Sequence, residues 1–566
     1  MLKGIPVSEG TGIGRAYVIR STELKYEKKA VEDKQAEKER LHAAVEEYCK
    51  RTDVAADKLS ETAPKEAEII RGHKIMMQDP FMISQIDDKI ENGLCAEAAG
   101  EEVLDMFRGM FLAADDEFTR QRATDVDDIK AGLLRILLGV KEQNLSDIPP
   151  ASIIITEDLT PSMTAALDKN NVCGIVTENG GRTSHSAILA RALELPAVLS
   201  VPDAVSVMED GMTVIVDGSE GIVIAEPDKE TQQFYIKKQE AFAAEKKLLA
   251  DYADRPTVTA DGQKKEVYCN IGNISDAVTA SEKSGEGIGL FRTEFLFMES
   301  EHAPDEDLQF ETYKKAAQLF KDGSVIIRTL DVGGDKNIPY LGMQPEANPF
   351  LGFRAVRYCL ENKELFRTQL RAIIRASAFG CIRIMVPLVT SVSEMRQVRQ
   401  LIEEIKCELE AEGTDFDRDI QLGAMIETPA ASMIADLLAK ECDFFSIGTN
   451  DLTQYTMAAD RGNPQVSYLN NVYEPAVLRS IQHIIKCAGG AGIPVGMCGE
   501  AAADPLMIPL LIAFGLDEFS VTPASVLKTR YNISKWTKEE ADRIADVAMA
   551  LETADEIEKY LKAEIK

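Results

Sequence analysis

The chain has 566 residues, of which 45% are hydrophobic and 28% charged, and its formal net charge at pH 7 is −31. This composition is typical of a soluble globular protein with about two to four domains. The large excess of carboxylates argues against a nucleic-acid partner, because a phosphate backbone requires lysine and arginine.

Cysteine usage and the N-terminal sequence indicate a cytoplasmic protein. The ten cysteines form no CxxC pair and show no regular spacing, which favours reduced thiols over a disulfide framework or a zinc site. No apolar segment of the signal-peptide type follows Met1, so no signal peptide is expected. The longest near-apolar run, residues 505–516, is too short to span a bilayer and predicts a buried helix, so no membrane insertion is expected.

Residues 1–22 and residues 23–147 differ in character. Residues 1–22 are rich in glycine and contain short β-like runs. Residues 23–147 carry long heptad-like helical patterns with few glycines and prolines, and they predict an all-helical insertion of several antiparallel helices. The acidic faces of these helices are typical of a solvated surface and are also a candidate docking surface for a partner.

Residues 148–228 return to short strands separated by turns. Strands are predicted at residues 152–156, 174–177, 197–201 and 213–217. Together with residues 1–22 they predict a compact α/β domain whose chain is interrupted by the helical insertion. Residues 229–258 are charged and helix-prone and predict a linker helix between two domains, although the same pattern fits a helix packed on either neighbour.

A motif inside this α/β domain centres on His185. Its sequence is Gly180-Gly181-Arg182-Thr183-Ser184-His185-Ser186, and a helical pattern follows. Two glycines allow a tight turn, and Thr183 or Ser184 is a natural N-cap, so His185 is predicted at a helix N-terminus. There the amide N–H groups and the positive end of the helix dipole would stabilise a phosphorylated imidazole. An ordinary turn, in which the histidine only caps a helix, is the alternative.

The motif resembles the phosphohistidine signature of the phosphoenolpyruvate-using phosphotransferases, which include Enzyme I of the sugar phosphotransferase system, pyruvate phosphate dikinase and phosphoenolpyruvate synthase. The resemblance implies that His185 carries the phosphoryl group. Thr164 matches a family threonine that contacts the active histidine, although a threonine at the start of a helix is commonly only its cap.

From residue 259 to residue 566, a strand followed by a helix is the repeating pattern. Eight strands are predicted, at residues 266–271, 287–291, 325–329, 382–387, 422–426, 444–447, 494–497 and 518–521. This repeat predicts a TIM-type (β/α)8 barrel. The predicted fold class is therefore multidomain α/β, with catalytic groups expected at the carboxyl ends of the barrel strands.

Charged or reactive residues follow five of these strands at the point where the apolar run stops. The segments are Arg292-Thr293-Glu294, Arg328 to Lys336, Glu427-Thr428-Pro429, Gly448 to Leu452 and Cys498-Gly499-Glu500. Solvated surface charge would be scattered over both ends of a barrel, so this placement predicts a site at one end. Two carboxylates can hold Mg²⁺, and arginines supply planar forks for the phosphate and the carboxylate of phosphoenolpyruvate.

Nearly the whole chain resembles Enzyme I in domain order, and Asn348 to Arg354 resembles another of its substrate-binding motifs. The resemblance implies that the substrate is bound by Arg292, Arg328, Arg354, Asn450, Asp451 and Arg461. It implies that Glu427 and Asp451 hold Mg²⁺ and that Cys498 is the acid that protonates the enolate. It also implies a homodimer formed through the barrel, and a carrier protein, HPr, that docks on the helical insertion.

The implied reaction is a relay, the first step of sugar uptake by the phosphotransferase system. His185 accepts the phosphoryl group from phosphoenolpyruvate, pyruvate leaves, and a histidine of HPr receives the group. Because His185 must reach two sites, the α/β domain is predicted to swing about the linker helix. An ATP-using dikinase or synthase is disfavoured because no glycine-rich nucleotide signature is present. An inactive regulatory scaffold of the same fold is disfavoured because every expected catalytic residue type is present.

Overall fold

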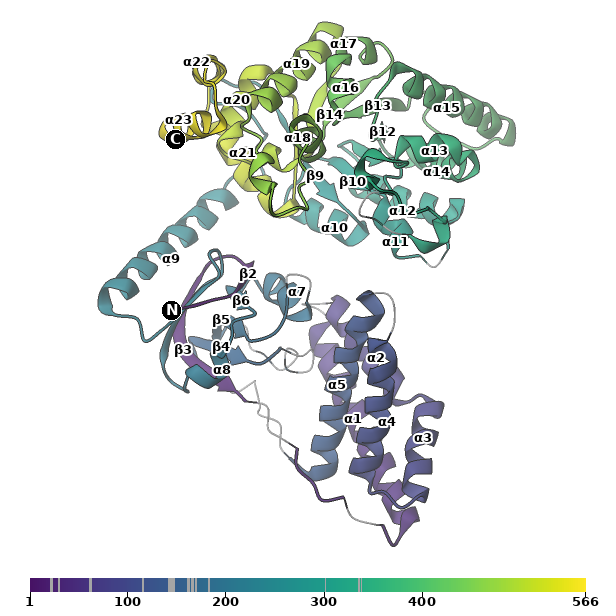
Figure 1. Ribbon diagram of the computed structural model, residues 1–566, viewed down its shortest axis with the longest axis vertical. Coiled ribbons are helices and arrows are strands. Elements are labelled where there is room, and N and C mark those ends of the chain that lie inside the picture. Colours follow the sequence, from purple (N-terminus) through teal and green to yellow (C-terminus); the bar gives the residue numbers. More distant parts are fainter. Residues whose placement is uncertain are drawn as a thin grey trace. The chain divides into compact units, whose positions relative to one another are not determined.

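The computed structural model of the chain describes residues 1–20, 24–28, 31–60, 64–113, 117–140, 148–159, 163, 167, 170–181, 184–300, 302–333, 336 and 338–565. These residues form two compact units, residues 1–246 and residues 247–566 (Figure 1). None of the helices among the described residues is both long enough and apolar enough to cross a membrane.

The first unit contains a mixed sheet built from both ends of its sequence. Among the described residues its strands are β1 (Leu2–Lys3), β2 (Ile5–Ser8), β3 (Thr11–Ile19), β4 (Ser152–Thr156), β5 (Val172–Thr177), β6 (Ala197–Leu199), β7 (Thr213–Asp217) and β8 (Ile222–Ala225). Their order is β1-β8-β7-β3-β4-β5-β6-β2. Strand β3 pairs in parallel with β4 and antiparallel with β7 and lies in the middle of the sheet, whereas β1 and β2 of the same N-terminal segment form its two edges.

The helices of the first unit divide into a bundle and a sheet-associated set. The bundle helices are α1 (Lys34–Leu59), α2 (Pro64–Met77), α3 (Pro80–Glu91), α4 (Ala96–Leu112) and α5 (Glu117–Leu138). They share their own apolar core, which includes Leu41, Ile86, Ala99 and Ile129. The predicted helical insertion is therefore present (Figure 1). In the described part of the chain, the sheet-associated helices include α7 (His185–Ala192) and α8 (Ala204–Val207).

Helix α9 (Lys229–Ala250) follows the sheet and ends eight residues before the predicted limit of the linker helix. Its N-terminal part packs on the sheet of the first unit. Lys238 forms an ion pair with the buried Asp217, and Gln239 Nε2 donates to the carbonyl oxygen of Thr11 at 2.9 Å.

The second unit is a closed barrel of parallel strands, which confirms the predicted (β/α)8 fold (Figure 1). Among the described residues the strands are β9 (Glu266–Ile271), β10 (Ile288–Arg292), β11 (Val325–Arg328), β12 (Ile382–Val386), β13 (Gln421–Ile426), β14 (Phe444–Ile447), β15 (Val495–Met497) and β16 (Glu518–Val521). Strand β16 pairs with β9 and closes the barrel. Each predicted barrel strand is present, with ends that differ from the prediction by at most one residue.

The barrel strands alternate with helices. These are α10 (Ile274–Glu282), α11 (Glu294–Met298), α12 (Glu306–Leu319), α13 (Val356–Glu361), α14 (Lys363–Ala376), α15 (Val392–Glu412), α16 (Pro429–Met433), α17 (Ala435–Leu438), α18 (Thr449–Met457), α19 (Pro475–Ala491), α20 (Met507–Phe514), α21 (Val526–Ser534), α22 (Lys538–Ala548) and α23 (Ala554–Glu564). Helix α20 corresponds to the near-apolar run, and Met507 to Ile512 are buried as predicted.

Candidate active site

A cavity of about 350 Å³ lies at the carboxyl ends of the barrel strands. All of the barrel residues singled out by sequence line it. They are Arg292, Arg328, Arg354, Glu427, Asn450, Asp451, Arg461 and Cys498. Because parallel barrel strands end on the same face, five segments separated by up to 200 residues contribute to one cavity.

The arginines of this cavity are held by buried carboxylates. Arg328 is 6% exposed, and its Nη2 donates to Oε1 of Glu294 at 2.5 Å. Arg354 is 3% exposed, and its Nη2 donates to Oδ1 of Asp331 at 2.7 Å. Burial disfavours ionisation of both carboxylates, but the adjacent cations outweigh it, so the pKa values of Glu294 and Asp331 lie below their usual range.

Glu294, Asp331 and Lys336 were not among the residues predicted from the sequence, although all three lie in the quoted strand-end segments. Lys336 Nζ donates to Oε1 of Glu294 at 2.7 Å and lines the same cavity. The available signal was their position two to eight residues beyond a strand-end arginine. That signal does not show which carboxylate meets which cation.

Glu427 is only 2% exposed, although carboxylates normally lie at the protein surface. Burial raises its pKa to about 8, the neighbouring Asp451 and Asp331 act in the same direction, and Arg328 opposes them. The N–H of Leu388 donates to Glu427 Oε1 at 2.6 Å. Leu388 has φ of 55°, a costly conformation for a branched side chain, so local strain accompanies this contact.

The residues present fit a magnesium ion. Glu427 and Asp451 are neighbouring buried carboxyl groups, so that Asp451 helps to raise the pKa of Glu427, and Asp451 Oδ1 has no hydrogen-bond partner among the described residues. A divalent cation would relieve both features. In the described parts of the chain, no group of three or more His, Cys, Asp or Glu side chains is placed to hold a metal ion.

Cys498 lies directly after β15, is 5% exposed and lines the cavity. Burial raises the pKa of its thiol to about 11. The thiol therefore stays protonated at neutral pH, as a proton donor must, whereas a nucleophilic cysteine requires a lowered pKa.

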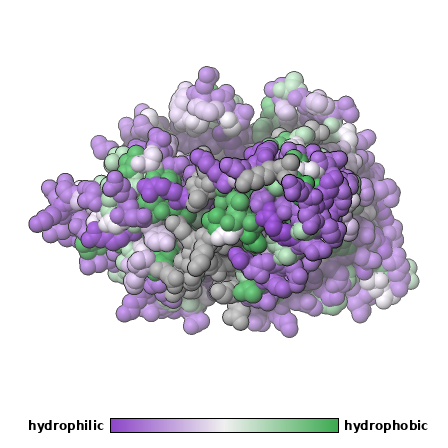
Figure 2. Space-filling model, turned by 90° about the horizontal axis from the view of Figure 1, so that it is seen from below, coloured by the Kyte–Doolittle hydropathy of each residue, from purple (hydrophilic) through white to green (hydrophobic). Residues whose placement is uncertain are grey.

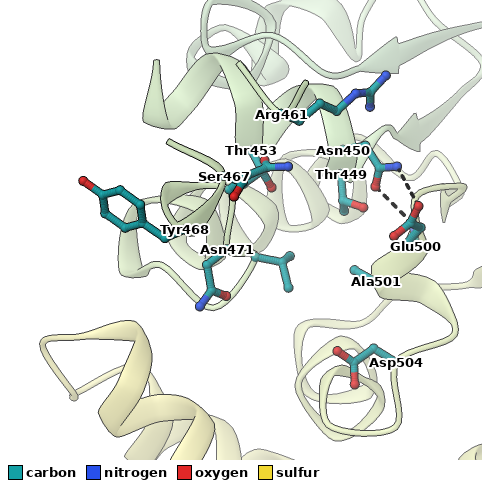
Figure 3. A pocket seen from close by; sticks show the side chains of 12 residues that line it. Thr449, Asn450, Thr453, Arg461, Ser467, Tyr468, Asn471, Glu500, Ala501 and Asp504 are labelled. Atoms are coloured by element: carbon teal, nitrogen blue, oxygen red, sulfur yellow. Dashed lines mark hydrogen bonds between the residues drawn. The ribbon is translucent and has the colours of Figure 1, made fainter. Parts of the chain in front are cut away.

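A second, polar pocket of about 610 Å³ adjoins the cavity and shares Asn450, Arg461 and Glu500 with it. Figure 3 shows Asn450 and Glu500 facing each other across its edge. Asn450 Nδ2 donates to Glu500 Oε1 at 3.5 Å, and the N–H of Glu500 donates to Asn450 Oδ1 at 3.3 Å. Glu500 therefore fixes the amide of Asn450 at the boundary between the two spaces.

His185 is the first residue of α7, as its motif predicts. The N-cap is Ser184, whose side chain accepts from the N–H of Ala187 at 3.3 Å, and Gly180 has φ of 105°, which glycine adopts readily. The side chain of His185 lies outside what the structure describes, as do Arg182, Thr183 and Thr164 as a whole. The roles of His185 and Thr164 therefore stay predictions.

A (β/α)8 barrel with arginines, a lysine and a carboxylate pair at its strand ends defines an enzyme that acts on a phosphorylated anion. Three family models agree with this. The PEP-binding domain of PEP-utilising enzymes matches residues 246–538, the mobile domain matches residues 148–221, and the N-terminal domain matches residues 3–122.

Curated relatives match over the full length. The phosphoenolpyruvate-protein phosphotransferase of Priestia megaterium is 44% identical to this chain, and the match covers 99% of this chain and 98% of the relative. The enzyme of the same name from Bacillus subtilis is also 44% identical, and that match covers 100% of both chains. The enzyme of the same name from Streptococcus equinus is 46% identical over 94% of each chain. The chain therefore belongs to the PEP-utilising enzyme family, within its phosphoenolpyruvate-protein phosphotransferases, the Enzyme I proteins.

Proposed function

We propose that this chain takes the phosphoryl group of phosphoenolpyruvate onto His185 and passes it to a histidine of the carrier protein HPr, the first step of sugar uptake. One observation carries the barrel half of this proposal: eight residues expected from sequence line a single cavity. The full-length identity of 44% to named phosphotransferases supports the rest.

In the first step, Nε2 of the neutral His185 imidazole forms a bond to phosphorus while the phosphorus–oxygen bond to the enolate breaks. Arg292, Arg328, Arg354 and Arg461 bind the phosphate and carboxylate, and Asn450 orients them. Such positioning and charge neutralisation are the main requirements of phosphoryl transfer. Mg²⁺ bound by Glu427 and Asp451 would neutralise charge on the substrate oxygens.

Cys498 completes the first step. Its thiol gives a proton to the methylene carbon of the enolate, which yields pyruvate, and the thiolate later regains a proton from solvent. The high pKa of the thiol keeps the proton available until the strongly basic enolate forms.

The helical bundle offers a surface on which the carrier would dock. Phe81 of α3 is 61% exposed and contacts Phe107 of α4 edge to face, with ring centroids 6.3 Å apart. Met110, one helical turn after Phe107, is 63% exposed. Figure 2 shows one mostly hydrophilic face of the molecule, interrupted by a few hydrophobic patches.

A homodimer formed through the barrel and a cytoplasmic location belong to the same proposal. They are supported by membership of the family and by the cysteine pattern of the sequence.

The proposed function is tested by intact mass after incubation with phosphoenolpyruvate and Mg²⁺ at mildly alkaline pH. The expected result is one acid-labile phosphoryl group on the wild-type chain and none on His185→Ala. A gain that requires ATP and phosphate would support the dikinase alternative. Absence of any gain under all conditions would support the inactive scaffold.

A further inference from the structure

Asp331 lies among three of the cations that line the cavity. Its carboxylate accepts from Arg354 Nη2 at 2.7 Å and lies 3.3 Å from Arg328 Nη1 and 3.6 Å from Lys336 Nζ. The side chain is only 2% exposed. One buried carboxylate therefore forms ion pairs with three cations, two from the end of β11 and the segment after it and one, Arg354, from a later loop.

Glu294 supports the same arrangement through the other terminal nitrogen of Arg328. Its Oε1 accepts from Arg328 Nη2 at 2.5 Å and from Lys336 Nζ at 2.7 Å, and it is 1% exposed. Lys336 also donates to the main-chain oxygen of Asp331 at 3.1 Å. Arg328 and Lys336 are thus shared by two carboxylates, whereas only Asp331 also reaches Arg354.

The charges around the cavity nearly cancel. Its lining includes five cationic side chains and five carboxylates, namely Arg292, Arg328, Lys336, Arg354 and Arg461 against Glu294, Asp331, Glu427, Asp451 and Glu500. A free anion that enters the cavity is therefore attracted only weakly by its net charge. To bind the arginines and the lysine, it must compete with the carboxylates that already form ion pairs with them.

We propose that Asp331 is a positioning and selectivity residue for the substrate phosphate. It holds Arg328, Arg354 and Lys336 in place for the transferring group and compensates their charge, so that inorganic phosphate alone binds weakly. This inference rests on the proposed function for the identity of the substrate. The arrangement of charges does not depend on it.

The substitution Asp331→Asn keeps the shape of the side chain and removes its charge. Inorganic phosphate should then bind at least tenfold more tightly, because Arg354 loses its hydrogen-bonded carboxylate and Arg328 and Lys336 share only Glu294. The value of kcat for pyruvate release should fall about a hundredfold, because the three cations are held less firmly in place. A residue that only stabilised the fold would weaken phosphate binding when removed. Phosphate affinity is measured by calorimetry on the full chain without Mg²⁺, and kcat and KM from initial rates.

Asp415→Asn is the matched control, because Asp415 is exposed in the loop before β13, at the opposite end of the barrel strands, and its loss changes net charge equally. It should alter neither phosphate affinity nor kcat.

Asp331→Glu provides a second variant in case Asp331→Asn does not fold. It keeps the charge but shifts the carboxylate, so phosphate affinity should equal that of the wild type while kcat falls about tenfold.

The proposal is overturned if Asp331→Asn binds phosphate no more tightly than the wild type, or if Asp331→Glu retains full kcat. Failure of the proposed function has a separate signature. In that case the wild-type chain would release no pyruvate from phosphoenolpyruvate. The phosphate affinities of the Asp331 variants would still show whether Asp331 compensates the charge of the three cations.

Discussion

A Cβ atom at position 448 would lie 2.6 Å from Oε2 of Glu427. Gly448 follows β14 and Glu427 follows β13, so the backbone of one strand end passes directly beside the carboxylate of its neighbour. The glycine is required for space and not for a left-handed conformation, since its φ is −88°.

Substitution of Gly448 by alanine should therefore displace Glu427 and weaken magnesium binding. We expect the Mg²⁺ concentration for half-maximal activity to rise at least tenfold. Gly489→Ala is the matched control, because no atom lies within 4 Å of a Cβ there and the residue is exposed in α19. It should leave the magnesium requirement unchanged and stabilise the helix by about 0.5–1 kcal/mol. Equal magnesium requirements in both variants would contradict the assignment of Glu427.

Magnesium binding should release a proton below about pH 8. The pKa of Glu427 is raised to about 8 in the absence of metal, so the carboxyl is largely protonated at pH 7 and must ionise to bind a cation. Apparent magnesium affinity should thus increase with pH up to about 8 and level off above it. Calorimetry at pH 7 in two buffers of different ionisation enthalpy measures the released proton. A binding heat that is independent of the buffer would show that Glu427 is already ionised or is not a ligand.

Replacement of Cys498 by serine should lower pyruvate release at least a hundredfold, because a hydroxyl is a much weaker acid than a thiol. Phosphoenolpyruvate affinity should change little, so the loss should fall on kcat and not on KM. Cys359→Ser is a control at another buried thiol, since Cys359 Sγ donates to the carbonyl oxygen of Leu330 and does not line the cavity. A Cys498→Ser variant with normal kcat would remove the cysteine from the mechanism.

The barrel interior contains a further carboxyl, Glu518 of β16, whose pKa burial raises to about 8, with Arg383 opposing. Its carboxyl lies beside two glycines, because a Cβ at Gly289 would be 2.2 Å from Oε1 and one at Gly496 3.0 Å from the carboxyl carbon. In the folded chain this group keeps its proton to about pH 8, whereas the unfolded chain releases it near the ordinary glutamate pKa of 4.5. The free energy of unfolding therefore falls as pH rises from about 4.5 to 8, by at most about 1.4 kcal/mol per pH unit.

Glu518→Gln removes this titration. The variant should match the wild type near pH 5 and become progressively more stable than it toward pH 8, as measured by thermal midpoints across that range. A difference in midpoint that does not change with pH would mean that Glu518 is ionised in the folded chain.

The barrel fold and most of the residues that line its cavity could be predicted from the sequence. Apolar runs that stop at Arg292, Arg328, Glu427 or Cys498 specify both a strand and the end at which it exposes a reactive group, because all carboxyl ends of a parallel barrel share one face. Strand β8 was not predicted, since Ile222–Ala225 is short and has no alternation to distinguish it from a loop.

Counter-ions were harder to predict than ligands. Asp331 and Glu294 belong to the motifs already recognised, but their function depends on contacts with Arg354 and Lys336 across separate loops, and spacing along the chain does not determine such contacts. Helix α9 spans Lys229–Ala250 and so lies within the predicted linker region, residues 229–258.

The most direct test of the central claim is a single-turnover experiment with phosphoenolpyruvate, Mg²⁺ and no ATP, in which pyruvate and phosphohistidine are both quantified and the phosphorylated peptide is mapped. We expect one pyruvate for each phosphoryl group, with that group on His185 and discharged when HPr is added. Pyruvate formed without phosphohistidine, or a phosphoryl group on a different residue, would contradict this expectation.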